Sequence, residues 1–180
     1  MTMPIPERTK TVKRASTLAA GLCAAATMGL SQEPSSLSET YGDWTLQCVT
    51  NDAPLDTGEV GRICQVSQEL RQSDGGSRVI TAVFKTDPVK ITFFTPFGLL
   101  LTAGIDLSVG ERKLPSSAFR TCLPEMGCVA EGFFNAEDLA EIRSSETLSV
   151  LMTAESGQKL QVDLSLEGFS DAVMKLESIQ

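Results

Sequence analysis

The spacing of the cysteines is the feature that most constrains this chain. Four of its five cysteines form two close pairs, Cys48 with Cys64 and Cys122 with Cys128, and the chain contains no histidine. Neither spacing fits a usual zinc pattern, no imidazole can complete a mixed zinc site, and a Cys-x-x-Cys redox motif is absent. Four cysteines allow three disulfide pairings, and proximity in the sequence favours the two close pairs as structural disulfides.

The segment 1–31 has the composition of a signal peptide. Four basic residues and one acidic residue precede an apolar, alanine-rich stretch from Ala15 to Leu30. This stretch is short for a bilayer span and no cationic stop follows it, so we expect cleavage before Gln32. Cys23 lies within the segment, but Leu22 occupies the position where a lipid-modified cysteine normally follows a small residue. A lipoprotein is therefore the less favoured alternative.

The charge of the chain becomes more negative without this leader. The whole chain carries −8, and the leader holds four of its 15 basic and one of its 23 acidic residues, so the remainder is near −11. A field of this sign disfavours nucleic acid and anionic lipid as partners. Threonine, proline and glycine interrupt the most apolar later stretch, 91–105. We therefore expect a protein that is not integral to a membrane.

Beyond the leader, we expect a flexible tail over 32–40 and one β-rich domain over 41–180. Apolar and polar residues alternate with the period of a half-buried strand, as in Trp44, Leu46 and Cys48. Turn residues such as Ser73-Asp-Gly-Gly76 separate these segments. Strands are predicted over 44–49, 63–70, 78–86, 90–94, 99–102, 104–107, 117–122, 129–133, 148–153 and 160–166.

Two short helices are predicted near the end of the chain. Asn135 is a good N-cap, with Asp138 at the capping-box position, and the helix is expected to end near Arg143. Ser170 is expected to cap a second helix that runs to Ile179. Many short strands with little helix predict a mostly β fold, a twisted antiparallel β-sandwich or open barrel stapled by two disulfides.

No set of residues in the sequence predicts catalysis. Lys113 lies near Ser116 and Ser117, but such a spacing is common by chance and no G-x-S-x-G motif is present. Acidic residues gather around the start of the predicted first helix, where their negative charges interact favourably with the helix dipole. They are Glu131, Glu137, Asp138 and Glu141. We therefore predict a protein that is not an enzyme and has no cofactor or metal, with a carboxylate-dependent hydrolase using Glu131 and Asp138 as an alternative.

Aromatic residues are dense around the predicted strand 90–94. Phe93 and Phe94 must point to opposite faces of a strand because they are consecutive. One of them, together with Phe97, is therefore a candidate for an exposed patch that contacts a partner. The same stretch leaves a second alternative, a carrier of an apolar ligand held between sheets near Phe93 and Leu101.

Several short motifs together resemble the invasion-associated locus B family. They are Gly42-Asp-Trp44-x-x-x-Cys48, Cys64-Gln65, Pro96-x-Gly98, Cys122-x5-Cys128 with its Gly127-Cys128 step, and Ser165-Leu166-x-Gly168-Phe169-x-x-Ala172. In this order and at this spacing, the motifs give a match that spans residues 41 to about 175. The resemblance implies export to the periplasm or cell surface of a Gram-negative bacterium and a link to host-cell entry, without catalytic residues to carry over.

These observations together predict an exported, non-enzymatic protein that binds a protein or an envelope component. The candidate partner patch is Phe93, Phe94 and Phe97, and the disulfide residues are the four cysteines of the two close pairs.

Overall fold

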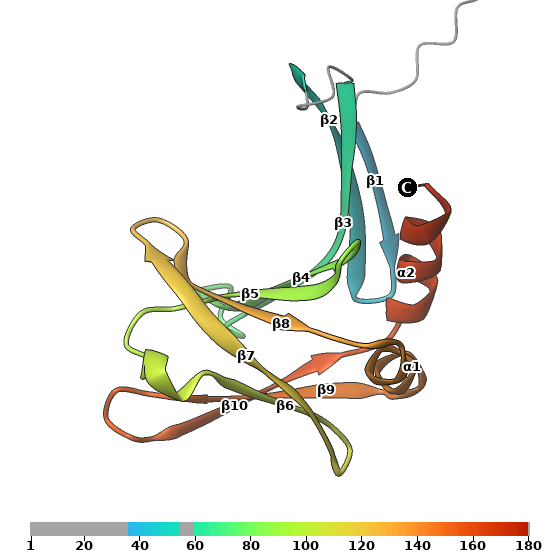
Figure 1. Cartoon of the computed structure of the whole chain (residues 1–180). Coiled ribbons are helices and arrows are strands. Elements are labelled where there is room, and N and C mark those ends of the chain that lie inside the picture. Colours follow the sequence, from blue (N-terminus) through green and yellow to red (C-terminus); the bar gives the residue numbers. More distant parts are fainter. Residues whose placement is uncertain (1–35, 55–59, 180) are drawn as a thin grey trace, which may run out of the picture. The chain divides into compact units, whose positions relative to one another are not determined.

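In the part of the chain that the structure describes, the alternating segments of the sequence form ten strands of one antiparallel sheet. The computed structural model describes residues 36–54 and 60–179, all within one compact unit, Pro34–Gln180 (Figure 1). The predicted leader, 1–31, lies outside the described residues. The strands are β1 (Ser36–Tyr41), β2 (Trp44–Pro54), β3 (Val60–Arg71), β4 (Arg78–Thr86), β5 (Val89–Thr95), β6 (Ile105–Val109), β7 (Arg112–Leu123), β8 (Gly127–Phe133), β9 (Thr147–Thr153) and β10 (Lys159–Ser165).

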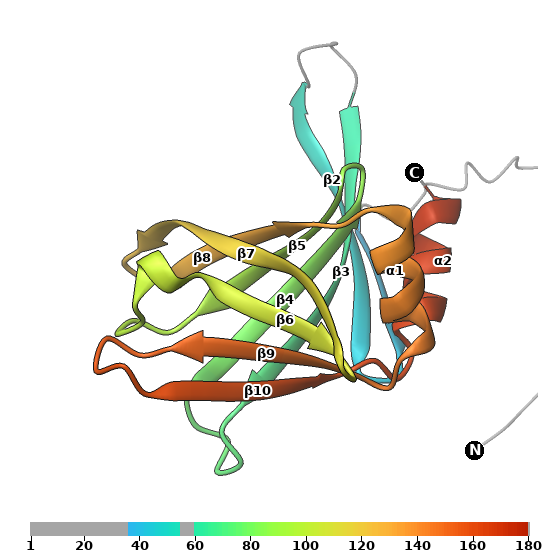
Figure 2. The same cartoon turned by 60° about the horizontal axis from the view of Figure 1, so that its bottom comes forward.

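The sheet curls because one long strand belongs to two layers. The strand order is β1-β2-β3-β4-β5-β8-β7-β6-β9-β10. The first half of β7 pairs with β6, and its second half, from Ala118 onward, pairs with β8. In Figures 1 and 2, β4, β5 and β8 form one layer, and β6, β9 and β10 form the other. The predicted mostly β, antiparallel fold with an open, barrel-like curl is confirmed.

Aromatic residues fill the core between the sheet and the second helix. The helices are α1 (Ala136–Ser144) and α2 (Phe169–Ser178), with a 3-10 turn over Leu101–Ala103. Trp44 and Phe84 are fully buried, and the ring of Phe169 lies edge-on to both, with centroids 4.9 and 5.1 Å away. The indole nitrogen of Trp44 donates to the carbonyl of Ser165, so this buried polar group is satisfied.

Both disulfides join residues that face each other across neighbouring strands. Cys48 on β2 pairs with Cys64 on β3, and Cys122 on β7 pairs with Cys128 on β8. The Cα atoms are 4.0 and 3.9 Å apart, the close approach of directly opposite residues in an antiparallel pair. The pairing favoured from the sequence is the pairing that the structure contains. The first disulfide links adjacent strands and does not bridge two layers.

Two glycines let the turn before β2 meet the start of α2. Gly168 has φ +79°, and a Cβ atom there would lie 2.1 Å from the carbonyl oxygen of Tyr41. A Cβ atom on Gly42 would lie 2.5 Å from the carbonyl oxygen of Glu167. The backbone N–H of Asp43 donates to that same oxygen at 3.1 Å. Only residues without a side chain permit this approach, which brings the first and last motifs of the sequence together.

The helix starts differ in how well the sequence predicted them. α1 follows Asn135, which accepts from the backbone N–H of Asp138 at 2.8 Å, while the Asp138 carboxylate accepts from the N–H of Asn135 at 3.3 Å. This confirms the predicted capping box. The prediction that Ser170 caps α2 is wrong, because the helix begins at Phe169 after Gly168. The left-handed backbone of Gly168 reverses the chain and turns Phe169 into the core.

The predicted flexible tail over 32–40 is wrong for 36–40. These residues belong to β1, which pairs with β2 from Ser36 opposite Val49 to Tyr41 opposite Trp44. Leu37 and Tyr41 pack against the core, and Ser38 and Thr40, which alternate with them, are exposed. Serine and glutamate content suggested disorder, but a strand that pairs along one edge needs only this half-apolar alternation.

Among the described residues, no helix has the length and apolar character needed to cross a membrane.

Candidate functional site

The predicted aromatic patch divides between the core and the surface. Phe93 is 0% exposed and points into the core, so its inclusion in a partner patch is wrong. Phe94 lies on the outer face of β5, as expected for the next residue of a strand, and is half-buried. Phe97 follows β5 in a turn and is 57% exposed. Phe94 and Phe97 are therefore the two members of the predicted patch that have accessible surface.

Phe94 lies in a hollow on the outer face of the sheet. This hollow has a volume of about 320 Å³ and runs from β2 to β5. Met126, which is 41% exposed in the turn between β7 and β8, lines the hollow with Val83 and Phe94. Polar side chains supply the remainder of the lining: Gln47, Gln65, Ser67, Glu69, Arg78 and Thr81.

A neighbouring hollow continues this surface along β4 and β5. It has a volume of about 250 Å³ and shares Gln65, Val83 and Phe94 with the first. Lys85, Lys90 and Thr92 complete its lining. We name the two hollows together the outer-face groove. Its middle is apolar, its sides carry amides and hydroxyls, and lysines lie at one end.

Ion pairs at the lysine end of the groove tie it to β8. Lys90 Nζ donates to Glu131 Oε1 at 2.7 Å, and Arg120 Nε lies 3.4 Å from Glu131 Oε2. The hydrogen bond from Lys90, together with the charges of Lys90 and Arg120, lowers the pKa of Glu131 and outweighs the opposing effect of burial. Glu131 is therefore held as a carboxylate, whereas a general acid requires a raised pKa.

The other predicted acids surround a different cation. Arg112, the first residue of β7, lies 3.0 Å from Glu137, 3.4 Å from Asp138 and 3.4 Å from Glu141. These three acids come from the first turns of α1. They form ion pairs with Arg112 and also interact favourably with the positive end of the helix dipole. The four acids of the sequence prediction thus form two separate ion-pair clusters. Neither arrangement resembles a pair of carboxylates set aside for hydrolysis.

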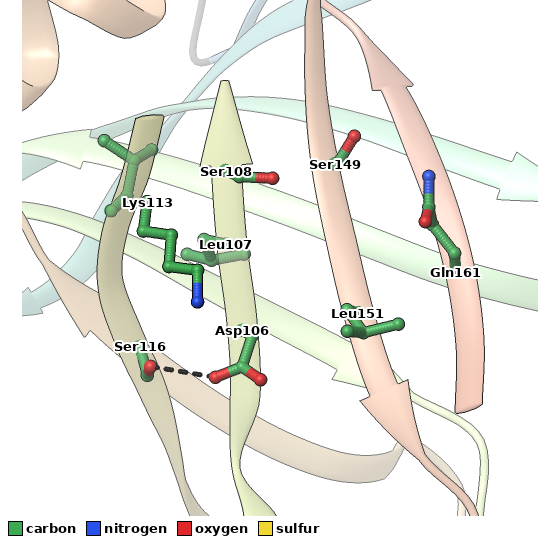
Figure 3. A pocket seen from close by; sticks show the side chains of 9 residues that line it. Asp106, Leu107, Ser108, Lys113, Ser116, Ser149, Leu151 and Gln161 are labelled. Carbon is green, nitrogen blue, oxygen red and sulfur yellow. Dashed lines mark hydrogen bonds between the residues drawn. The ribbon is translucent and has the colours of Figure 1, made fainter. Parts of the chain in front are cut away.

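The serines near Lys113 do not form a nucleophile and base. Ser116 Oγ donates to Asp106 Oδ1 at 3.1 Å (Figure 3). Ser117 is buried, and its hydroxyl has no hydrogen-bond partner among the described residues. Within that same part of the chain, no hydrogen bond joins Lys113 to either serine. A Ser–Lys mechanism needs such a bond, or a geometry close to it.

The structure also separates the two residues of the carrier alternative. Phe93 is enclosed in the core, while Leu101 lines a surface hollow of about 260 Å³ with Phe119. The two side chains therefore face different surroundings. In the described part of the chain, no group of three histidine, cysteine, aspartate or glutamate residues is placed to hold a metal ion.

Comparison with known proteins identifies the family. Residues 44–177 match the family model described as Invasion associated locus B (IalB) protein. The chain belongs to this family. An invasion protein B homolog of Brucella abortus is 34% identical over 149 residues, covering 81% of this chain and 82% of the relative. Invasion protein B of Bartonella bacilliformis is 31% identical over 155 residues, covering 81% and 77%.

A solved IalB-family structure is similar in fold. The crystal structure of invasion associated protein B from Bartonella henselae aligns with a TM-score of 0.66 and 26% identity, over 80% of this chain and 97% of that one. The names of these relatives describe invasion proteins, and none of these names describes an enzyme. The resemblance predicted from the sequence motifs is confirmed.

The sequence prediction missed most of the groove in this IalB-family chain. Val83 and Met126 were not among the candidates, and neither were Gln47 and Gln65, which line the groove with Phe94. A signal was present, because β4 carries apolar residues in both phases of its alternation, with Val83 on the outer face. An outward apolar residue beside an outward aromatic one indicates a covered or contact surface.

Proposed function

We propose that this IalB-family protein is exported, acts without catalysis and binds a protein through the outer-face groove. The leader composition supports export. Two disulfides are typical of proteins that fold in an oxidising compartment such as the periplasm or cell exterior. The relatives' names support a role in invasion, and we extend this role to the present chain.

One observation carries the binding proposal: Phe94 and Met126 present apolar surface within a groove whose sides are polar. Specific protein interfaces have this composition, with a few apolar anchor residues surrounded by hydrogen-bonding groups. The groove runs across strands β2 to β5, so it fits an extended segment of a partner better than a compact ligand. Lys85 at one end favours a segment with an acidic residue there, whereas Lys90 is already paired with Glu131.

The catalytic alternatives lack such support. The pKa of Glu131 is lowered, the α1 acids bind Arg112, and Ser116 donates to a carboxylate. Glu131, the α1 acids and Ser116 are therefore already engaged in ion pairs or hydrogen bonds, and Ser117 and Lys113 are not hydrogen-bonded to each other among the described residues.

Site-specific photocrosslinking tests the proposal. A photoreactive residue at Gln65 should capture a protein partner from envelope or host-cell membranes. Phe94→Ala should weaken the binding of this partner about 30-fold, as expected for an anchor residue that contributes about 2 kcal/mol to binding. Phe97→Ala is the matched control, because Phe97 is an exposed aromatic residue that does not line the groove.

Equal capture by the wild type and by Phe94→Ala would contradict the use of the groove. Because Phe94 is half-buried, Thr92→Lys at the edge of the groove serves as a second variant with little effect on packing. Capture of lipid or glycan alone would exclude a protein partner.

A further inference from the structure

A polar hollow lies on the other layer of the sheet, away from the residues of the outer-face groove. It has a volume of about 220 Å³ and is formed by β6, β7, β9 and β10 (Figure 3). Strand alternation places its polar side chains on the outer face, while Leu107, Val150 and Leu164 of the same strands are buried in the core. Ser108 lies opposite Lys113 on one neighbouring strand and opposite Ser149 on the other.

Hydrogen bonds within the wall use the hydrogens of two of its serine hydroxyls, so the groups left to face the hollow are mainly acceptors. Ser149 Oγ donates to Asp163 Oδ1 at 2.8 Å, and Gln161 Nε2 donates to the same oxygen at 3.0 Å. Ser116 Oγ donates to Asp106 Oδ1 at 3.1 Å. A hydroxyl has one hydrogen, so Ser116 and Ser149 retain only lone pairs for a ligand. Asp106 Oδ2 and Gln161 Oε1 add two further acceptors.

Lys113 supplies the principal donor. Figure 3 shows its side chain running along the hollow toward Asp106 and Ser116. Among the described residues its ammonium group forms no ion pair or hydrogen bond, so its three hydrogens remain available. The hollow therefore presents one cationic donor and several acceptors, one of them anionic. Leu151, which is half-buried on the outer face of β9, adds an apolar surface.

We propose that this hollow binds one ring of a neutral sugar. A sugar hydroxyl both donates and accepts, so adjacent hydroxyls accept from Lys113 and donate to Asp106 at the same time. The C–H face of the ring packs on Leu151. An anionic ligand is disfavoured because Asp106 lies in the wall and Asp163 is hydrogen-bonded to the wall residues Ser149 and Gln161. The volume is below the roughly 300–1,000 Å³ of sites for drug-sized ligands, which suits a single ring.

This inference is independent of the proposed protein groove, because the two surfaces share no lining residue. A single ring in an open hollow is expected to bind weakly, with a Kd of about 1 mM. A glycan chain that contacts the hollow at one ring would gain affinity from neighbouring contacts.

Backbone NMR titration of the protein produced from the full chain tests this site. The probes are glucose, galactose and N-acetylglucosamine, with acetate and inorganic phosphate as anionic probes. At least one sugar should give saturable shifts at the amides of Ser108, Ser149 and Gln161. Asp106→Asn and Lys113→Met should each weaken binding about tenfold, the effect of losing one charge-assisted hydrogen bond.

The matched controls are Asp87→Asn, in the exposed turn between β4 and β5, and Lys175→Met on α2. Both should bind the sugar as the wild type does. All four changes lie on the surface, and an unchanged melting temperature confirms that each variant is folded. The proposal is overturned if no sugar gives saturable shifts, if the two pocket variants bind unchanged, or if only the anionic probes bind.

Discussion

Phe169 is the residue whose replacement should destabilise this fold most clearly. It is 1% exposed and lies edge-on to Trp44 and Phe84, with centroids 4.9 and 5.1 Å away. Truncation of a buried phenylalanine to alanine costs about 3–5 kcal/mol. Each edge-to-face pair supplies about 0.5–1.5 kcal/mol of this. Phe169→Ala should therefore lower the free energy of unfolding by about 4 kcal/mol.

Urea denaturation followed by tryptophan fluorescence provides the assay, because Trp44 is the only tryptophan and contacts the altered site. Met174→Ala on the same helix is the control. Met174 is 52% exposed, so its loss should change the free energy of unfolding by less than about 0.5 kcal/mol.

If Phe169→Ala fails to fold, Phe169→Leu keeps the test open. Leucine retains most of the apolar volume and loses both ring pairs, for an expected loss of about 1–3 kcal/mol. A loss below about 1 kcal/mol for Phe169→Ala would refute the reasoning, since it would mean that α2 does not close the core through this ring.

Two further predictions concern the disulfides and acid stability. The disulfides Cys48–Cys64 and Cys122–Cys128 have sequence separations of 16 and 6, so their removal by double serine substitution should lower the free energy of unfolding by about 3 and about 2 kcal/mol, respectively. Denaturation without reductant measures both losses. Equal losses would contradict the chain-entropy account. Because the pKa of Glu131 is lowered from 4.5, its ionised form stabilises the fold above that pH, and this stabilisation is lost as pH falls through the lower folded-state pKa. Glu131→Gln should therefore be less stable than the wild type at neutral pH and lose less stability on acidification. If the free energies of unfolding of the two proteins fall in parallel as the pH is lowered, Glu131 contributes nothing to acid stability.

Local patterns in the sequence were enough to predict most of the strands and one helix start. The alternation of Trp44, Leu46 and Cys48 identified the inner face of β2, and Asn135 with Asp138 identified the start of α1. These signals depend on neighbours in the sequence and on simple backbone geometry. The family motifs followed from the same residues.

Features that depend on distant contacts could not be predicted. β1 is a strand because β2 pairs with it, and its own composition resembles that of a tail. The start of α2 depends on the approach of Gly168 to Tyr41, more than 120 residues earlier in the chain. Likewise, the outer-face groove requires Met126 to reach Phe94 from another hairpin. These contacts join residues that are far apart in the sequence, so no local pattern predicts them.

The position of β8 between β5 and β7 imposes an order in time on this chain. β5 ends at Thr95, but the strand that covers its edge ends only at Phe133. Whether the chain emerges from a ribosome or across a membrane, the β1–β5 meander can assemble while that edge, with Ile91 and Phe93 in its strand, stays open. An open apolar edge recruits other chains. A holding chaperone should therefore be needed most during the interval in which residues 96–133 are still being delivered.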